Sequence, residues 1–99
     1  MGKGKADDMG WTFLTNHMHV LLCLAKSPAE RMCDIAVKVG ITERTVQHII
    51  AELEAAEYIK RLRKGRRNVY HIYGRLPLRH PIERHRRVRD IIQLINGES

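Results

Sequence analysis

Two adjacent segments decide the fold: residues 32–40, MCDIAVKVG, and residues 41–54, ITERTVQHIIAELE. In both segments the apolar residues recur at the spacing of one helical face. These faces consist of Met32, Ile35, Ala36 and Val39 in the first segment, and of Val46, Ile49, Ile50 and Leu53 in the second. Gly40 can adopt the positive φ that ends a helix, and Thr42 can cap the helix that follows. The pattern predicts two helices joined by a short turn, which is a helix-turn-helix.

The opposite face of the second predicted helix carries polar side chains suited to hydrogen bonding with DNA. These side chains are Thr42, Glu43, Arg44, Thr45, Gln47 and His48. Arg44 can donate to guanine or to phosphate, and Gln47 can pair with adenine. The threonine hydroxyls and the helix N-terminus can bind phosphate, whereas Glu43 either accepts from cytosine or only complements the helix dipole. We interpret this helix as the one that reads DNA; the alternative is an ordinary amphipathic surface helix.

A predicted β-hairpin follows the second helix. The β-forming stretches 58–63, YIKRLR, and 69–73, VYHIY, flank residues 64–68, KGRRN, which contain the Gly and Asn that hairpin loops need. A hairpin directly after a helix-turn-helix is the wing of a winged helix. At its tip, Lys64, Arg66 and Arg67 suit phosphate contact or insertion into a narrow minor groove. We expect Asn68, also a candidate DNA-binding residue, to act mainly as a turn residue.

Residues 41–54 together with 65–70, GRRNVY, resemble winged helix-turn-helix regulators of the broad MarR and ArsR type, particularly the small single-domain bacterial members. The resemblance covers residues 11–95. It implies a mainly α fold (α+β) with a small β-hairpin and with flanking helices at both ends. It also implies a transcription regulator that binds double-stranded DNA, with repression more common than activation. The family usually has Gly at the end of the recognition helix, where this chain has Glu57. Because a left-handed conformation strains a residue other than Gly, we predict that this helix ends differently here.

Positive charge is concentrated in the second half of the chain. The net charge is +7, but residues 60–89 contain twelve Lys and Arg against the single acid Glu83, which gives +11. Residues 1–59 and residues 90–99 each carry −2. A basic run that coincides with a wing indicates a polyanionic partner. The alternative is a solvated surface without a partner.

We expect residues 1–10 to be disordered and residues 11–99 to form one domain. A first helix is predicted over residues 11–26, ended by Ser27 and Pro28. An extended linker over residues 74–80 leads to a last helix over residues 81–96, with Pro81 in its first turn and Gly97 after its end.

That last helix carries an apolar seam that requires a cover. The seam consists of His85, Val88, Ile91, Ile92 and Ile95. It either packs on its own domain or pairs with a second copy of the chain. We favour a homodimer, because palindromic operators are read by two-fold dimers.

Other classes of function have weaker support. Arsenic- and zinc-responsive relatives place cysteines near Cys33, but the second nearby Cys of that motif is missing, so we expect no metal and no cofactor. Cys23 and Cys33 are expected to be reduced and buried small side chains. No catalytic motif, signal peptide or apolar run of about 20 residues is present, so we expect a cytoplasmic protein that is not an enzyme. A winged helix used for protein–protein interaction and a metal- or thiol-responsive regulator remain as alternatives, and RNA binding is disfavoured by the scarcity of aromatic residues.

Overall fold

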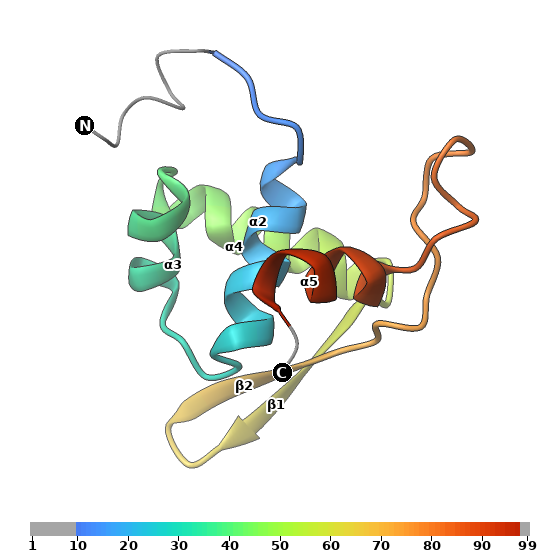
Figure 1. The fold of residues 1–99 in the computed structure, drawn as a ribbon. Helices are drawn as coiled ribbons and strands as arrows, with labels where there is room; N and C mark the ends of the chain where they lie inside the picture. Colours follow the sequence, from blue (N-terminus) through green and yellow to red (C-terminus); the bar gives the residue numbers. More distant parts are fainter. Residues whose placement is uncertain (1–9, 98–99) are drawn as a thin grey trace.

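The computed structural model describes residues 10–97. Within this range the chain forms α2 (Asn16–Lys26), α3 (Met32–Val39), α4 (Glu43–Ala55), the strands β1 (Ile59–Lys64) and β2 (Arg67–Ile72), and α5 (Val88–Asn96) (Figure 1). The two strands pair antiparallel. The predicted fold class, a mainly α winged helix-turn-helix with a small hairpin, is confirmed. The predicted disordered segment 1–10 lies, except for Gly10, outside the described residues.

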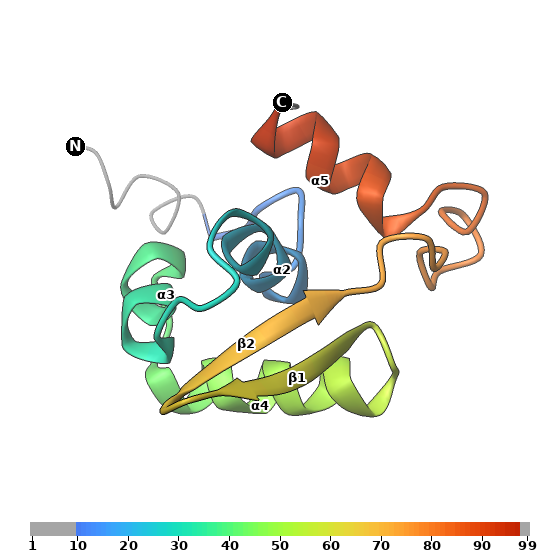
Figure 2. The ribbon, with the colours of Figure 1, turned by 90° about the horizontal axis from the view of Figure 1, so that it is seen from below.

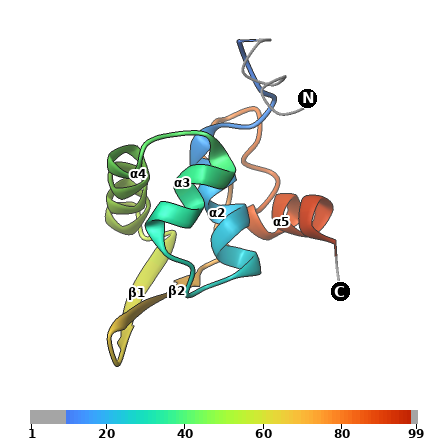
Figure 3. The ribbon, with the colours of Figure 1, turned by 90° about the vertical axis from the view of Figure 1, so that its left-hand side faces the viewer.

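The core is built around α2, which lies between α4 and α5 (Figure 3). The predicted apolar faces of α3 and α4 supply most of the remaining core. Their fully or largely buried members are Ile35, Ala36, Val46, Ile49, Ile50 and Leu53. Leu24 and Val20 of α2 are completely buried between them. Since α2 contacts both α4 and α5, it fixes where those two helices stand in the domain.

Helix α2 is shorter at its start than predicted. The helix was expected from Trp11, but it begins at Asn16. Thr15 is extended, with φ −78° and ψ 166°, and its hydroxyl accepts a hydrogen bond from the Met18 amide at 3.3 Å. Because the cap residue has a non-helical backbone, the four residues before it cannot continue the helix. Trp11 and Phe13 instead make an edge-to-face ring contact, with both side chains exposed.

The turn between α3 and α4 forms as predicted. Gly40 has φ 86°, and its amide donates to the Ala36 carbonyl at 2.8 Å, which closes α3. Thr42 then caps α4, because its hydroxyl accepts from the Thr45 amide at 3.0 Å. These two local signals hold α4 at a defined angle to α3, with the apolar faces of both helices turned to α2.

The prediction that α4 ends differently from its relatives is wrong. Among the described residues, Glu57 is the only residue other than glycine with a positive φ, at 68°. The Glu57 amide donates to the Glu54 carbonyl, and the Tyr58 amide reaches back to the Leu53 carbonyl, both at 2.9 Å. This closure is the one that a glycine normally supports. Burial of Leu53 and Ile59 on either side of the turn holds the chain in this conformation despite the side chain.

Replacing Glu57 with Gly is therefore expected to stabilise the domain by about 1 kcal/mol, because Gly removes the left-handed strain. Thermal unfolding monitored by circular dichroism would measure the change. Glu57→Ala is the matched control, since it removes the carboxylate but keeps the β-carbon. A gain from Ala equal to that from Gly would show that charge rather than backbone strain is responsible.

The hairpin is longer, and its loop shorter, than predicted. Lys64 pairs with Arg67, so only Gly65 and Arg66 form the turn. Gly65 has φ 62°, which suits the first position of a two-residue II′ turn. Asn68, expected as a turn residue, lies instead in β2 opposite Arg63. The hairpin is called the wing below.

The segment between the wing and α5 differs most from the prediction. The last helix was expected from Pro81, but α5 begins at Val88. Residues 76–78 run antiparallel to residues 86–88: the Leu78 amide donates to the Arg86 carbonyl at 2.9 Å, and the Val88 amide donates to the Leu76 carbonyl at 3.0 Å. Residues 76–88 therefore form a closed protruding loop, here called the arginine loop (Figure 1). The helix cannot begin before Val88, because the backbone groups of residues 86–88 are already paired.

Candidate nucleic-acid interface

The polar face of α4 is open to solvent over its N-terminal half. All six predicted residues of this face, Thr42, Glu43, Arg44, Thr45, Gln47 and His48, are exposed. Within residues 10–97, the side chains of Arg44, Gln47 and His48 make no hydrogen bond to another residue. The buried positions of α4 alternate with them at helical spacing. This leaves three polar side chains on a rigid helix with unused hydrogen-bonding groups.

The two threonines at the start of α4 form hydrogen bonds within the helix cap. The Thr42 and Thr45 hydroxyls lie 2.9 Å apart and hydrogen-bond to each other, in addition to the cap bond. Other amides of the first turn have no partner inside the helix, so an anion can still dock at this end. The structure thus assigns Thr42 a capping role, while leaving it exposed beside the polar face.

The C-terminal half of α4 is acidic, but its carboxylates have basic neighbours. His17 Nε2 of α2 lies 2.6 Å from Glu52 Oε1. This hydrogen bond is the main cause that lowers the pKa of the Glu52 carboxyl, and the charges of His17, His48 and Arg79 act in the same direction. Arg61 Nε of β1 lies 3.4 Å from Glu54 Oε2. These contacts reduce the repulsion that the acids would otherwise exert on a polyanion.

The tip of the wing presents exposed cations. Lys64 and Arg66 are exposed, and Arg63 Nε donates to the Gly65 carbonyl at 3.1 Å, which braces the turn. Figure 2 shows the wing tip and the N-terminal end of α4 toward the same side of the molecule.

Arg67 is partly engaged within the domain. Its Nη1 donates to the Ala29 carbonyl at 2.7 Å, in the connection between α2 and α3. The neighbouring strand residue Tyr70 donates its amide to the Pro28 carbonyl at 3.0 Å. Arg67 therefore anchors the wing to the helices, and its remaining donors are the ones available to a ligand.

Sequence reasoning missed two groups of exposed cations. On the wing, Lys60 and Arg63 of β1 are exposed although they were not among the predicted site residues. Strand alternation would place these two side chains on opposite faces, but in β1 every residue after Ile59 is exposed, so alternation alone could not have identified both. The second group lies between the wing and α5, where the wrong helix prediction concealed it. It comprises Arg75, Arg79, Arg84, Arg86, Arg87 and Arg89, all exposed.

The predicted dimer seam is divided between the domain and its surface. Val88 is buried in the core, and Ile91 and Ile92 are partly buried against it. Ile95 is 53% exposed and its neighbour Leu94 is 75% exposed. His85 is exposed and lies in the arginine loop, not on α5. The start of α5 therefore packs on its own domain, while its end leaves apolar surface exposed.

The cysteines are free thiols, as predicted, but Cys33 is exposed and not buried as expected. Its position on the outer side of α3, next to Asp34, explains the difference. No group of three potential metal ligands occurs among residues 10–97. Likewise, no helix within these residues has the length and apolar character needed to cross a bilayer.

The comparison with known protein families agrees with the winged helix fold described above. A sequence model of the MarR family matches residues 15–69, which is more than half of the chain. The matched range runs from the cap of α2 through the helix-turn-helix and into β2 of the wing. A search of curated proteins found no match.

Proposed function

Because the chain belongs to the MarR family, whose members are DNA-binding transcriptional regulators, we propose that it is a homodimeric repressor that recognises a specific duplex sequence. In this proposal α4 enters the major groove, and the wing contacts the flanking backbone or minor groove. Regulators of this family are not enzymes, and the chemistry required here is recognition alone.

The observation that carries the proposal is the unpaired polar face of α4. Arg44, Gln47 and His48 are exposed and have no intramolecular hydrogen bonds within the described residues. A planar guanidinium fits the two acceptors of guanine, and a planar amide fits the acceptor and donor of adenine. Their fixed helical positions give them the geometry that base recognition requires. The core of a protein-interaction surface is usually enriched in aromatic residues and Met, and none of these three positions carries one.

The wing supplies contacts that do not depend on sequence. Lys64 and Arg66 at the tip, with the remaining donors of Arg67, can bind phosphate oxygens beside the groove. Asn68, half-buried in β2, supports the strand more than it reaches outward. We therefore assign specificity to α4 and sequence-independent affinity to the wing.

The exposed end of α5 supports dimerisation. Leu94 and Ile95 leave apolar surface in water at a cost that a second subunit removes. Figure 3 shows α5 and α4 on opposite sides of α2. A partner that covers α5 therefore leaves both copies of α4 free for DNA. A dimer seated on an operator would repress by excluding polymerase from the promoter.

Replacing Gln47 or Arg44 with Ala should cost about 1–3 kcal/mol on the preferred duplex and little on random DNA, because only the preferred duplex offers matching base edges. A selection from random duplexes would define the preferred site, and fluorescence anisotropy would measure both affinities.

Arg66→Gln is the matched control for this experiment, since it removes a cation from the wing and leaves α4 intact. We expect it to weaken binding to both duplexes by a similar factor. If the α4 variants also lose affinity equally on both duplexes, α4 does not specify sequence.

A further inference from the structure

The arginine loop, residues 76–88, is held together by hydrogen bonds. Its base is closed by the backbone pairing of residues 76–78 with 86–88, and Tyr58 donates its hydroxyl to the Pro77 carbonyl at 2.6 Å. Inside the loop, the Glu83 amide donates to the His80 carbonyl and the Arg86 amide to the Glu83 carbonyl, both at 2.8 Å. At the base of the loop, Leu76 and Leu78 are half-buried. The domain thus holds the loop in one shape.

The charge on this loop and its base is almost entirely arginine. Residues 75–89 contain six Arg, no Lys and one acid, Glu83. All six are exposed. None of them takes part in an ion pair among residues 10–97. Guanidinium groups that a protein concentrates and leaves without internal partners suit phosphate, which they bind in a bidentate manner.

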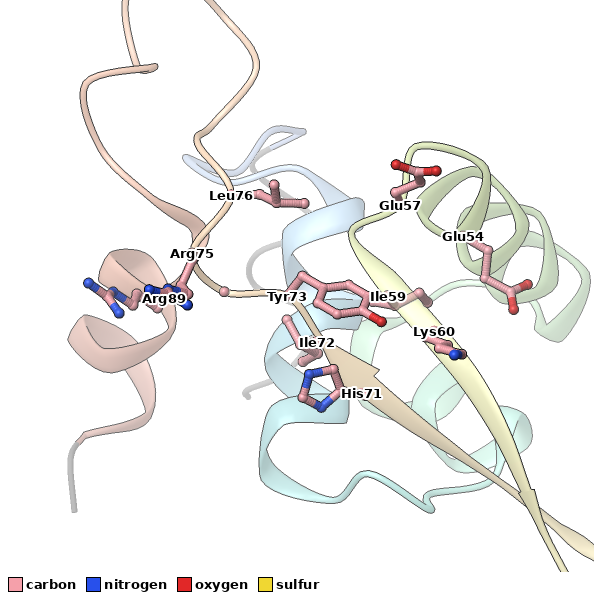
Figure 4. Close-up of a pocket in the computed structure, with 11 residues that line it drawn as sticks. Glu54, Glu57, Ile59, Lys60, His71, Ile72, Tyr73, Arg75, Leu76 and Arg89 are labelled. Carbon is pink, nitrogen blue, oxygen red and sulfur yellow. The ribbon is translucent and has the colours of Figure 1, made fainter.

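Arg75 and Arg89 lie next to the two ends of the arginine loop. The Arg89 amide donates to the Gly74 carbonyl at 2.9 Å, and a β-carbon on Gly74 would lie only 3.0 Å from that of Arg89. The glycine thus allows the two segments to approach. Figure 4 shows both arginine side chains together at one end of a hollow, with Glu54 and Glu57 of the α4 end at the other.

Along the axis of α4, the loop lies toward the C-terminal end of the helix and the wing tip toward the N-terminal end (Figure 2). Arg79 of the loop and Glu52 of α4 line the same hollow. Glu52 lies one and two turns beyond His48 and Arg44 on the same side of α4, and all three border one shallow hollow. The C-terminal end of α4 therefore borders the arginine loop.

We propose that the arginine loop is a second phosphate-binding element, which holds the duplex beyond the C-terminal end of α4. This inference rests on the proposed function. The 13 residues of α4 span about 20 Å, whereas the major groove is about 12 Å wide. A helix that crosses the groove thus approaches a phosphate backbone at each end. The wing binds one of these backbones, and the loop binds the other.

The test compares the salt dependence of duplex binding for two charge-matched double variants of the full chain. Arg84→Gln with Arg86→Gln alters the loop, and Lys64→Gln with Arg66→Gln alters the wing. Each lost phosphate contact lowers the slope of log K against log salt by about 0.9. Because each substituted residue occurs twice in the proposed dimer, each double variant removes four contacts and is expected to flatten the slope by about 4, and the quadruple variant by about 7. Lys26→Gln, at the exposed end of α2, controls for the general loss of one positive charge.

Hydroxyl-radical footprinting on the same duplex separates direct contact from general attraction. The loop variant should lose protection at phosphates that the wing variant still protects. If the loop variant keeps the wild-type slope and footprint while the wing variant changes both, the inference is overturned and the proposed function stands. If the wild type binds duplex without salt dependence, the proposed function itself fails. Circular dichroism should be unchanged in all variants, because the substituted side chains are exposed.

Discussion

Raising the salt from about 50 to about 200 mM is expected to weaken duplex binding by the wild-type protein at least a thousandfold. A dimer whose two wings each place three or four cations on phosphates makes roughly 6–8 such contacts, which corresponds to a slope of about −5 to −7. The wing tip supplies the exposed Lys64 and Arg66, and Arg67 supplies the donors not bonded to Ala29. Contacts from the arginine loop would make the slope steeper still.

Fluorescence anisotropy at four or five salt concentrations would measure this slope on the selected duplex and on random DNA. Both should show a steep dependence, since phosphate contacts are common to them. A slope near zero on both, with the protein folded, would contradict nucleic-acid binding. That result would favour a winged helix used for protein–protein interaction.

The second large effect is expected from Ile95→Glu. Ile95 is 53% exposed at the end of α5, so a charge is tolerated in the monomer. In a dimer that covers α5 the carboxylate would be buried without a partner, at a cost of several kcal/mol. The dimer should dissociate while the monomer keeps its helical signal. Operator affinity should then fall a hundredfold or more, because two half-sites are no longer engaged together.

Gln93→Glu is the matched control, because it adds the same charge to the exposed, opposite side of α5. It should leave the dimer intact in sedimentation velocity. A wild type that is monomeric at tens of micromolar would refute the dimer directly. A variant that unfolds would show that the end of α5 belongs to the core of its own domain, as Val88 at its start does.

The parts of the fold that depend on local sequence could be predicted. The periodicity of α3 and α4, the left-handed Gly40 and the Thr42 cap all act within a few residues, and each formed as expected. The start of α5 could not be predicted from Pro81, because pairing of residues 76–78 with 86–88 removes that option. This pairing depends on contacts across the loop, which the helix pattern of residues 81–96 does not reveal.

Glu57 is a second position where contacts distant in sequence decide the local structure. Its side chain disfavours the left-handed conformation locally, yet the packing of Leu53 and Ile59 holds it there. Tertiary contacts therefore overrode a correct local argument. The helix ends in the left-handed conformation that Gly adopts readily, and the strain remains in the backbone.

For the candidate site, helical periodicity was sufficient to place the exposed residues of α4. It was not sufficient for Arg67, whose bond to Ala29 joins positions 38 residues apart. The loop arginines were missed for a related reason: their charge was noticed, but a helix was assigned where the chain forms a loop.

The hydrogen bonds that join β2 to the connection between α2 and α3 have a consequence for the proposed complex with DNA: the DNA, and not the wing, has to change its shape. Arg67 and Tyr70 tie the strand to Ala29 and Pro28, so the wing cannot swing separately from the helices. In the proposed complex, the distance between α4 in the major groove and the wing beside it is therefore set by the protein. An operator must supply that separation through its own groove width and curvature, so sequences that deform easily to it are favoured even where no side chain touches a base.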